Sequence, residues 1–306
     1  MGRFLRNNKK IYENSAKKNK SIDIDSKGII IGSLEENNSK IISLVKDSNI
    51  NKNTIVLGAS GTGKTRSFVI PNIFQSISQG DSVIITDFKQ DIYCKTIEFL
   101  EGAGYTVKRL NLNSLLYKLT NTQYLKERSL ECIEEVLLQE EFDLELPGKE
   151  RCAYFIESND VNNRDMKVLA SDIITLLLER LLKFSVTIKS SNINFIFDDF
   201  ELIEKIPILF LFRSKKISVN VIFQSIRQFK KVYGKYEWIN ILDNCDNFLC
   251  FGDTDAETIN LVNRLRINDN EELNLNYIKK NEAVLILRNG TAVKVKKINL
   301  ELMIKS

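Results

Sequence analysis

The chain has 306 residues, of which 43% are hydrophobic and 27% charged, so it has enough apolar side chains for one large α/β domain or two average domains. It contains no histidine, which excludes histidine–zinc sites, Ser–His–Asp triads and Cys–His dyads. Any chemistry must therefore rely on carboxylates, Lys, Arg, backbone dipoles or a hard metal ion. The formal net charge of +4 permits an anionic partner without requiring one.

Residues 1–27 begin the chain with a polar, lysine-rich segment. Its first 20 residues contain one acid, Glu13, against the basic residues Arg3, Arg6, Lys9, Lys10, Lys17, Lys18 and Lys20. This composition predicts a basic flexible arm, and contact of the arm with nucleic acid or anionic lipid is the alternative. No stretch approaches the roughly 18–20 apolar residues of a membrane-spanning helix, so we expect no membrane span. The five cysteines form no C-x-x-C pair and are expected as buried, reduced thiols of a cytoplasmic protein.

From residue 28 onward, short apolar runs alternate with helical patterns. Residues 28–31 and 40–45 are expected to form a β-hairpin. Strands are expected at 54–58, 82–86, 106–110, 152–156, 194–197, 218–223, 248–251, 283–287 and 292–295. Helices are expected at 64–78, 91–102 and 164–184, the last with apolar residues at helical spacing. The alternation predicts an α/β fold with a central, mostly parallel sheet flanked by helices.

Residues 115–147 interrupt this alternation. They include the acidic residues Glu131, Glu134, Glu135, Glu140 and Glu141. We interpret the segment as a small helical insertion at the edge of the sheet.

The strongest motif is Gly58-Ala-Ser-Gly-Thr-Gly-Lys64-Thr65, a complete G-x-x-x-x-G-K-T that follows a predicted strand and opens a predicted helix. Glycines at these positions let backbone N–H groups face inward, and together with the helix N-terminus they bind phosphates. Lys64 would reach the β- and γ-phosphate oxygens, and Thr65 would coordinate Mg²⁺. The predicted residues of this P-loop are Gly58, Ala59, Ser60, Gly61, Thr62, Gly63, Lys64 and Thr65. The motif predicts ATP and Mg²⁺ as ligands on a RecA-like P-loop NTPase core.

Two later strands end in polar side chains suited to the same site. Asp198 and Asp199 follow the run 194–197, with Asp198 expected as the second metal-side ligand and Asp199 as the base that orients the attacking water. Gln224 follows another apolar run, and its amide can bridge the γ-phosphate and the water as a sensor. The chain has no LSGGQ-like signature of an ABC-type ATPase, and about fifty residues precede its P-loop, unlike most small-molecule kinases. The arrangement favours an oligomeric motor ATPase.

Further motifs accompany the P-loop in a fixed order. They are Gly28-Ile-Ile-Ile-Gly32, Val69-Ile-Pro-Asn72, Thr86-Asp-Phe-Lys89, Gly104-Tyr105, Leu110-Asn-Leu112, Asp198-Asp-Phe200, Lys205-Ile-Pro207, Arg213-Ser-Lys-Lys-Ile-Ser218, Gln224-Ser225 and Asn244-Cys-Asp246. This series resembles the TraG-like type IV coupling proteins of conjugation systems, hexameric DNA-pumping ATPases related to FtsK and HerA. The resemblance runs from about residue 28 to residue 300.

The resemblance implies a role for each matching site residue. Lys64 and Thr65 become ligands of the nucleotide and Mg²⁺, Asp198 the Walker B acid and Gln224 the sensor. Arg213 becomes the arginine that reaches the γ-phosphate of a neighbouring subunit in a homo-hexamer, whereas composition alone would make it a solvated charge at a helix end. The resemblance also implies sequence-independent binding of single-stranded DNA, with a relaxase and secretion-channel proteins as partners.

The chain also departs from the family's pattern. We expect no N-terminal membrane anchor, and we expect the family's helical domain to be reduced to 115–147. Asp199 stands where the family has glutamate, one methylene longer, so we expect slower hydrolysis. The family's TDPKGE has become Thr86-Asp-Phe-Lys-Gln-Asp91. The expected location is the cytoplasm or the inner face of the bacterial cell membrane, where a partner or the basic arm would hold the protein.

Two functions follow from these patterns. The first is an ATP-hydrolysing DNA translocase of a conjugative type IV secretion system. The alternative is a reduced ATP-binding adaptor or regulatory subunit that recruits partners without pumping DNA, and a small-molecule P-loop transferase comes third. The predicted domains are the basic arm (1–27), a P-loop ATPase domain (28–114 and 148–306) and the helical insertion (115–147).

Overall fold

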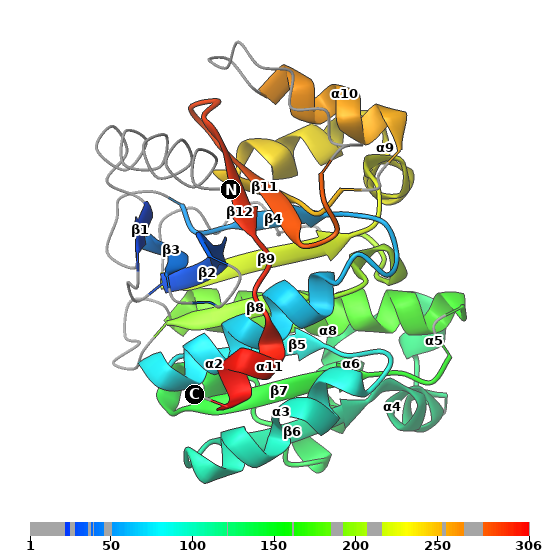
Figure 1. Cartoon of the computed structure of the whole chain (residues 1–306). Helices are drawn as coiled ribbons and strands as arrows, with labels where there is room; N and C mark the ends of the chain where they lie inside the picture. The colour runs from blue at the N-terminus through cyan, green and yellow to red at the C-terminus, as the bar shows by residue number, and fades with distance from the viewer. Residues whose placement is uncertain are drawn as a thin grey trace, which may run out of the picture. The chain divides into compact units, whose positions relative to one another are not determined.

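The computed structural model describes residues 22–24, 28–35, 38, 40–45, 51–120, 122–160, 162–184, 192–206, 216–252, 255–265 and 278–305 (Figure 1). They belong to two compact units. Unit 1 combines Met1–Gln75 with Val219–Ser306, and unit 2 is Ser76–Ser218. The basic arm lies outside the described residues except for a short strand, and the predicted domain boundaries stay a prediction.

Unit 1 is built on a mixed sheet. Its described strands are β1 (Ile22–Ile24), β2 (Gly28–Ser33), β3 (Ile41–Val45), β4 (Thr54–Leu57), β9 (Ile217–Phe223, in unit 1 from Val219), β10 (Asn247–Cys250), β11 (Glu282–Leu287) and β12 (Ala292–Lys296), in the spatial order β1-β3-β2-β12-β11-β10-β4-β9. β4 pairs in parallel with both β9 and β10, and all three are buried along their length, as strands covered on both faces are. The expected hairpin forms as antiparallel β2 and β3. β11 and β12 are also antiparallel, because the few residues between them are too short for a crossover.

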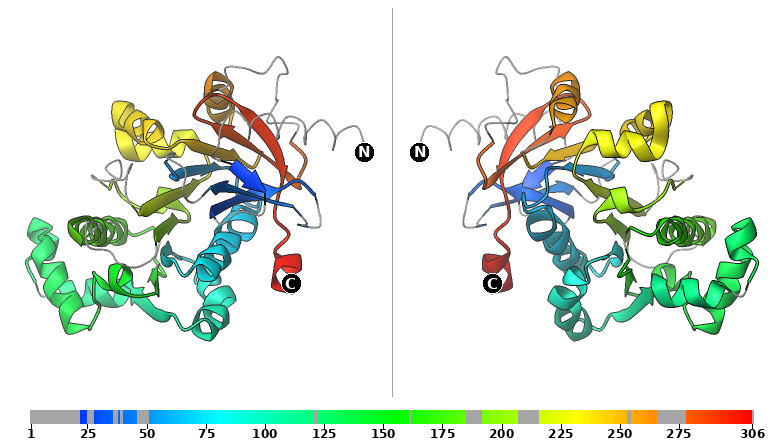
Figure 2. Two further views of the ribbon diagram at one scale, coloured as in Figure 1. Left: turned by 90° about the vertical axis from the view of Figure 1, so that its left-hand side faces the viewer. Right: turned by 90° about the vertical axis from the view of Figure 1, so that its right-hand side faces the viewer.

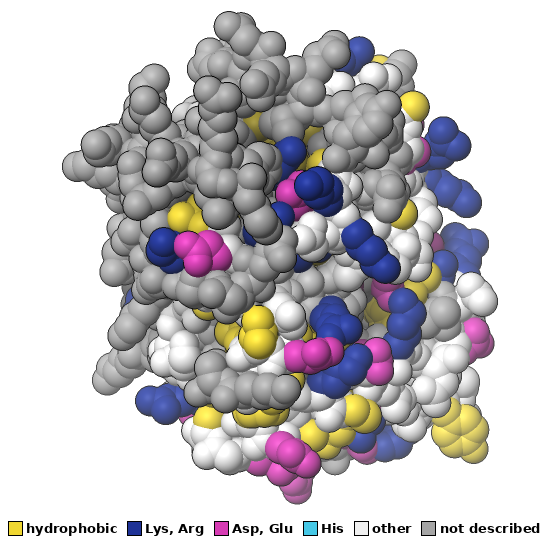
Figure 3. All heavy atoms as spheres, viewed as in Figure 1, with side chains coloured by type: hydrophobic (Ala, Val, Ile, Leu, Met, Phe, Trp, Pro, Cys, Tyr) yellow, Lys and Arg dark blue, Asp and Glu magenta, His cyan; other side chains and the backbone are white. Residues whose placement is uncertain are grey.

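The described helices of unit 1 are η1 (Thr65–Val69), α2 (Ile70–Gln79, in unit 1 up to Gln75), α9 (Ile226–Asp243), α10 (Ala256–Leu265) and α11 (Leu300–Lys305). The helix expected at 64–78 begins as a π-helical turn, in which the N–H of Ile70 donates to the carbonyl of Thr65. Pro71 has no N–H to donate to the carbonyl one α-helical turn earlier, which favours this local change of period. α9 is kinked at Gly234, whose φ of 71° is in the left-handed region. Figure 3 shows Lys and Arg side chains beside α9, at the right-hand side of the view.

Unit 2 contains a parallel sheet in the order β8-β5-β7-β6. The strands are β5 (Ser82–Thr86), β6 (Thr106–Asn111), β7 (Cys152–Glu157) and β8 (Ile193–Phe197). The helices are α3 (Asp91–Gly102), α4 (Leu112–Leu119), α5 (Tyr124–Glu127), α6 (Leu130–Gln139), α7 (Leu146–Lys149), α8 (Arg164–Phe184) and the 3₁₀ turn η2 (Phe200–Leu202). Strands and helices alternate as expected, and the prediction of an α/β fold is confirmed.

The segment 115–147 is helical, as expected, and Figure 2 shows α4–α7 grouped together with α8. Asp172 of α8 fixes α5 in place. It accepts a hydrogen bond from the Tyr124 hydroxyl at 3.0 Å and an ion pair from Arg128 at 2.5 Å. Burial, with the Asp172 charge beside it, raises the pKa of Tyr124, so this hydroxyl stays protonated and remains a donor.

The cysteines divide into two groups. Cys152, Cys245 and Cys250 are buried, and burial raises the pKa of each thiol, that of Cys250 to about 12. Burial was expected for all five cysteines, but this is wrong for Cys94, which is exposed, while Cys132 is half-buried. The buried face of α3 is formed at four-residue spacing by Ile92, Thr96 and Leu100, so Cys94 points away from it.

Among the described residues no helix combines the length and the apolar character needed to span a membrane.

Candidate functional site

The P-loop leaves the carboxyl end of β4, between two parallel neighbours. Leu57 of β4 pairs with Phe223 of β9 on one side and with Cys250 of β10 on the other. Gly58, Gln224 and Phe251 therefore follow three adjacent strands at one edge of the sheet. The structure thus brings Gln224 beside the start of the P-loop, where ligands bind in open α/β sheets.

Glycines shape the loop. Gly61 and Gly63 have φ values of 78° and 88°, a region in which other residues are strained. A Cβ atom at Gly58 would lie 2.7 Å from Cβ of Phe251 and 2.8 Å from Oγ1 of Thr62. The turn is closed by the Thr62 hydroxyl, which donates to the carbonyl of Ala59 at 2.8 Å.

Lys64 lies inside the loop. Its side chain is 8% exposed, and its Nζ donates to the carbonyl oxygens of Gly58 at 2.6 Å and Ala59 at 3.0 Å. Thr65 is the first residue of η1, so the helix N-terminus opens directly beyond this ammonium group. A buried cation beside a helix N-terminus is the combination that binds phosphate oxygens.

A second lysine, Lys297, contacts the loop and was not anticipated from the sequence. It follows β12, and its Nζ donates to the carbonyl of Thr62 at 2.9 Å and to that of Phe251 at 3.3 Å. The same Nζ is 4.9 Å from the centroid of the Phe251 ring. The only sequence signal is the basic run at the end of β12, which does not indicate where the ammonium group reaches.

The segment after Lys297 is held to the same part of unit 1. Asn299 and Asn38 exchange two hydrogen bonds, of 2.7 and 3.1 Å, each between a side-chain amide and a backbone group. Glu301 of α11 forms an ion pair with Arg66, which belongs to the turn that follows the P-loop. The chain from Lys297 to Glu301 is therefore fastened to the P-loop and to the turn between β2 and β3.

Asn72, of the Val69–Asn72 motif, connects the P-loop helix to β2. Its Oδ1 accepts from the N–H of Ile30 at 2.7 Å, and its Nδ2 donates to the carbonyls of Ile30 and Phe68 at 2.9 Å each. The side chain is 5% exposed. This motif thus joins two elements rather than contributing to the phosphate loop itself.

The acidic pair lies in unit 2, at the carboxyl end of β8. Asp198 is 7% exposed, its Oδ1 accepts from the N–H of Asp199 at 3.1 Å, and its backbone carbonyl accepts from the hydroxyl of Thr86 at 2.9 Å. Asp199 has φ 49° and ψ 47°, a left-handed conformation uncommon for a residue other than glycine. Its Oδ2 accepts from Nζ of Lys89 at 2.5 Å.

The Thr86–Lys89 motif therefore belongs beside this acidic pair. The hydrogen bond and charge of Asp199, with the nearby charges of Asp198 and Glu201, raise the pKa of Lys89. Asp87 of the same motif accepts from the N–H groups of Asp91 and Tyr93 and caps α3. Burial raises the pKa of Asp87 despite these hydrogen bonds.

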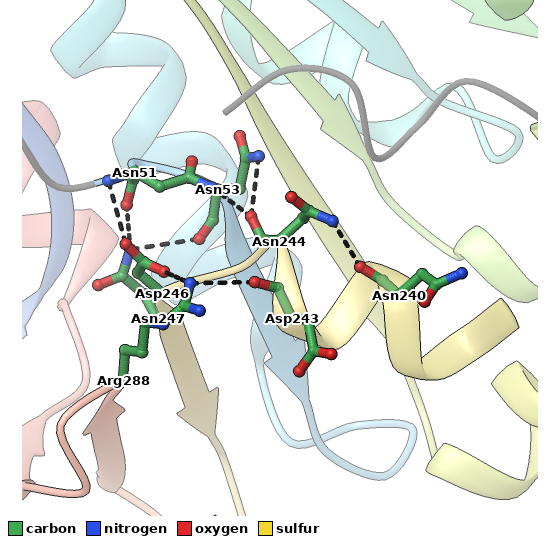
Figure 4. Close-up of polar contacts among 8 residues, drawn as sticks. All are labelled: Asn51, Asn53, Asn240, Asp243, Asn244, Asp246, Asn247 and Arg288. Atoms are coloured by element: carbon green, nitrogen blue, oxygen red, sulfur yellow. Dashed lines mark hydrogen bonds and ion pairs between the residues drawn. The ribbon is translucent and has the colours of Figure 1, made fainter. Parts of the chain in front are cut away.

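The Asn244–Asp246 motif lies at the other end of β4 from the P-loop, where β4 and β10 begin (Figure 4). The carbonyl of Asn244 accepts from the side-chain amides of Asn51 and Asn53, and Asp246 pairs with Arg288 at 2.8 Å. This network braces the start of the two strands. Arg213, the remaining candidate, lies outside the described residues.

Two family models match the chain. The model described as type IV secretory system conjugative DNA transfer matches residues 7–122. The model described as the TraM recognition site of TraD and TraG matches residues 192–265. No curated protein matches the chain.

Solved structures share its fold. VirB4 of Thermoanaerobacter pseudethanolicus aligns with a TM-score of 0.58 at 13% identity, over 92% of this chain and 99% of that chain. The bacterial conjugative coupling protein TrwBdeltaN70, in its unbound form, aligns with a TM-score of 0.61 at 13% identity, over 90% and 89%. The plasmid coupling protein TrwB in complex with ADP and Mg²⁺ aligns with 0.58 at 14%, over the same shares. The predicted α/β fold, with a central sheet flanked by helices, is thereby confirmed.

Proposed function

The chain belongs to the coupling protein family of type IV secretion, with TraG, TraD and TrwB, and from this premise we propose that it hydrolyses ATP to drive DNA through a conjugative secretion channel. The single observation that carries the proposal is the P-loop of unit 1. Its glycines adopt conformations that other residues avoid, and Lys64 is buried at the start of a helix. This loop fits a nucleoside triphosphate because cation, helix N-terminus and curled backbone lie together.

We assign the roles in ATP hydrolysis first to residues of the P-loop and then to residues outside it. Lys64 exchanges its contacts with the loop carbonyls for β- and γ-phosphate oxygens of ATP. Thr65 and Asp198 are the residues that would hold Mg²⁺, which when bound neutralises phosphate charge. Asp199 accepts a hydrogen bond from the attacking water and orients it, and Gln224 senses the γ-phosphate. The binding of ADP and Mg²⁺ by TrwB supports these assignments.

The remaining parts of the proposal concern assembly. We propose a homo-hexamer in which Arg213 of one copy stabilises charge on the γ-phosphate held by its neighbour. DNA would be bound through its phosphates, independently of sequence, and a relaxase and channel proteins would be the protein partners. The match to a model named for TraM recognition supports a partner-binding role for residues 192–265.

One observation favours the alternative, an ATP-binding adaptor that recruits partners without pumping DNA. The Asp199 carboxylate is already engaged by Lys89 at 2.5 Å. An aspartate held in this way has less freedom to approach a water molecule than a glutamate would have. A measurement of ATP hydrolysis distinguishes the translocase from the adaptor.

The test is steady-state ATP hydrolysis by the full chain, with and without single-stranded DNA. We expect hydrolysis to be stimulated by DNA and to be abolished in Lys64→Ala. ATP binding without turnover, unrestored by Asp199→Glu, would support the adaptor instead. Mixing Arg213→Ala with Lys64→Ala subunits tests the arginine, and full activity of Arg213→Ala alone would reject its role.

A further inference from the structure

α9 begins two residues after Gln224 and carries a surface that the proposed site does not use. Its inner face packs on unit 1, where Phe229 is stacked on Phe223 at 4.7 Å between ring centroids and is followed by Tyr233 at 4.9 Å. Ile226, Phe229 and Tyr233 are all buried. These contacts hold the part of the helix before the kink at Gly234 in place.

The outer surface of α9 is basic. Arg227 and Lys231, one helical turn apart, are exposed, and from Ile226 to Tyr236 the sequence contains no acidic residue. Lys230 forms an ion pair with Glu257 of α10 at 2.5 Å, so among the side chains of this helix that the structure describes, Arg227 and Lys231 are the cations that face solvent. Figure 3 shows Lys and Arg side chains standing out beside this helix. A surface of this charge is complementary to a phosphate backbone.

Aromatic side chains follow directly after the kink. Tyr236 is 69% exposed, although a large aromatic side chain is usually kept from water. Trp238 is half-buried, and its ring is covered on one side by Nζ of Lys230, 4.3 Å from the ring centroid. Basic groups beside exposed aromatic rings are the combination that binds single strands, because rings stack on unpaired bases while cations contact phosphates.

We propose that α9 is a contact surface for single-stranded nucleic acid, with Arg227 and Lys231 on phosphates and Tyr236 and Trp238 stacked on bases. The inference rests on the proposed function for the class of partner. Beyond that function, it assigns the contact with the nucleic-acid strand to α9, the helix that directly follows Gln224 and Ser225. Ser225 caps this helix by accepting from the N–H of Gln228, so a single residue connects Gln224 to α9.

The experiment uses the only tryptophan of the chain, Trp238, as its own reporter. We expect an oligothymidylate to quench its emission on titration, with affinity falling as salt is raised. Duplex DNA should quench less, since its bases are already stacked. Unchanged emission at saturating oligothymidylate, or equal quenching by the duplex, would overturn the stacking contact.

Variants test the surface through binding of a fluorescent oligothymidylate. We expect Tyr236→Ala to weaken binding by about tenfold and Arg227→Gln with Lys231→Gln to weaken it by at least as much, with a flatter dependence on salt. The matched control is Tyr117→Ala with Lys126→Gln, in which Tyr117 is 77% exposed on α4 of unit 2. Wild-type binding by the α9 variants, or an equal loss in the control, would overturn the proposal.

ATP hydrolysis measured in the same samples separates this inference from the proposed function. Stimulation of hydrolysis by DNA together with unaltered binding in the α9 variants would reject the α9 surface alone. Quenching that depends on Tyr236 and Lys231, without any turnover of ATP, would reject the motor function and leave the surface standing.

Discussion

Lys64 and Lys297 come from opposite ends of the chain and place their ammonium groups on carbonyl oxygens of the same loop. Lys64 bonds to Gly58 and Ala59, and Lys297 bonds to Thr62 and Phe251. Within the loop, the carbonyls of Gly58, Ala59 and Thr62 are therefore turned toward cations.

At this scale we predict that Lys297→Ala weakens ATP binding by about tenfold, because the carbonyl of Thr62 loses a charged donor and the loop loses order. The measurement is the dissociation constant of a fluorescent ATP analogue. Lys294→Ala is the matched control, since Lys294 lies on β12, three residues before Lys297, and its Nζ is 4.0 Å from a carboxylate oxygen of Glu282. An unchanged dissociation constant in Lys297→Ala would show that the loop holds its shape without this lysine.

Single residues also show what the sequence could reveal and what it could not. Gly58, Lys64 and Gln224 were predictable, because each belongs to a motif or follows an apolar run, and parallel strands end at a common edge. The contact between Lys297 and Thr62 spans 235 positions and depends on how the last strand docks. No spacing rule encodes that contact.

At the scale of elements, Asn72 joins the P-loop helix to β2 through two hydrogen bonds with Ile30. We predict that Asn72→Ala lowers the free energy of unfolding by about 3 kcal/mol, because the N–H and the carbonyl of Ile30 are left buried without this partner. Urea unfolding measures the change. Ser78→Ala, at an exposed position of the same helix, should change stability by less than about 0.5 kcal/mol. A similar effect of the two substitutions would contradict the role of Asn72.

The elements themselves followed their sequence patterns closely, with instructive exceptions. Most apolar runs became buried strands because helices cover both faces of the sheet, whereas the run at 106–110 became the edge strand β6, which is mostly half-buried. The period of the helix after the P-loop changed at Thr65–Val69 because proline at position 71 lacks an N–H, a local rule that helix periodicity does not contain. The Asn244–Asp246 motif had only a place in the ordered series of motifs and no predicted role, and the structure shows that it braces the end of β4 opposite the P-loop.

At the scale of the whole molecule, we expect low pH to reduce the stability of the fold by protonating Asp255, which lies where α9 and α10 meet. Burial alone would raise the pKa of Asp255, but hydrogen bonds from Thr258, Ser225 and the N–H of Glu257 bring it below its ordinary value of 3.8. The carboxylate of Asp255 therefore binds a proton less readily in the folded state than in the unfolded state. The resulting stability is fully present above pH 3.8 and is lost as the pH falls from there through the lower folded-state pKa.

We predict that Asp255→Asn is less stable than the wild type at neutral pH and loses less stability on acidification. Urea unfolding at a series of pH values between neutrality and about pH 3 measures how the free energy of unfolding depends on pH in each of the two proteins. Parallel curves for the two proteins would show that Asp255 does not contribute to the acid sensitivity.

The burial of the thiols has a practical consequence for following the two units in solution. Thiol-reactive dyes attack the thiolate, so Cys245 and Cys250, both buried and with raised pKa values, leave unit 1 unlabelled at neutral pH. Cys94, exposed on α3, offers an attachment point in unit 2, while Trp238 is a fixed fluorophore in unit 1. The unmodified chain thus carries a donor in one unit and an acceptor position in the other, and energy transfer between them would report any change in separation when ATP is added.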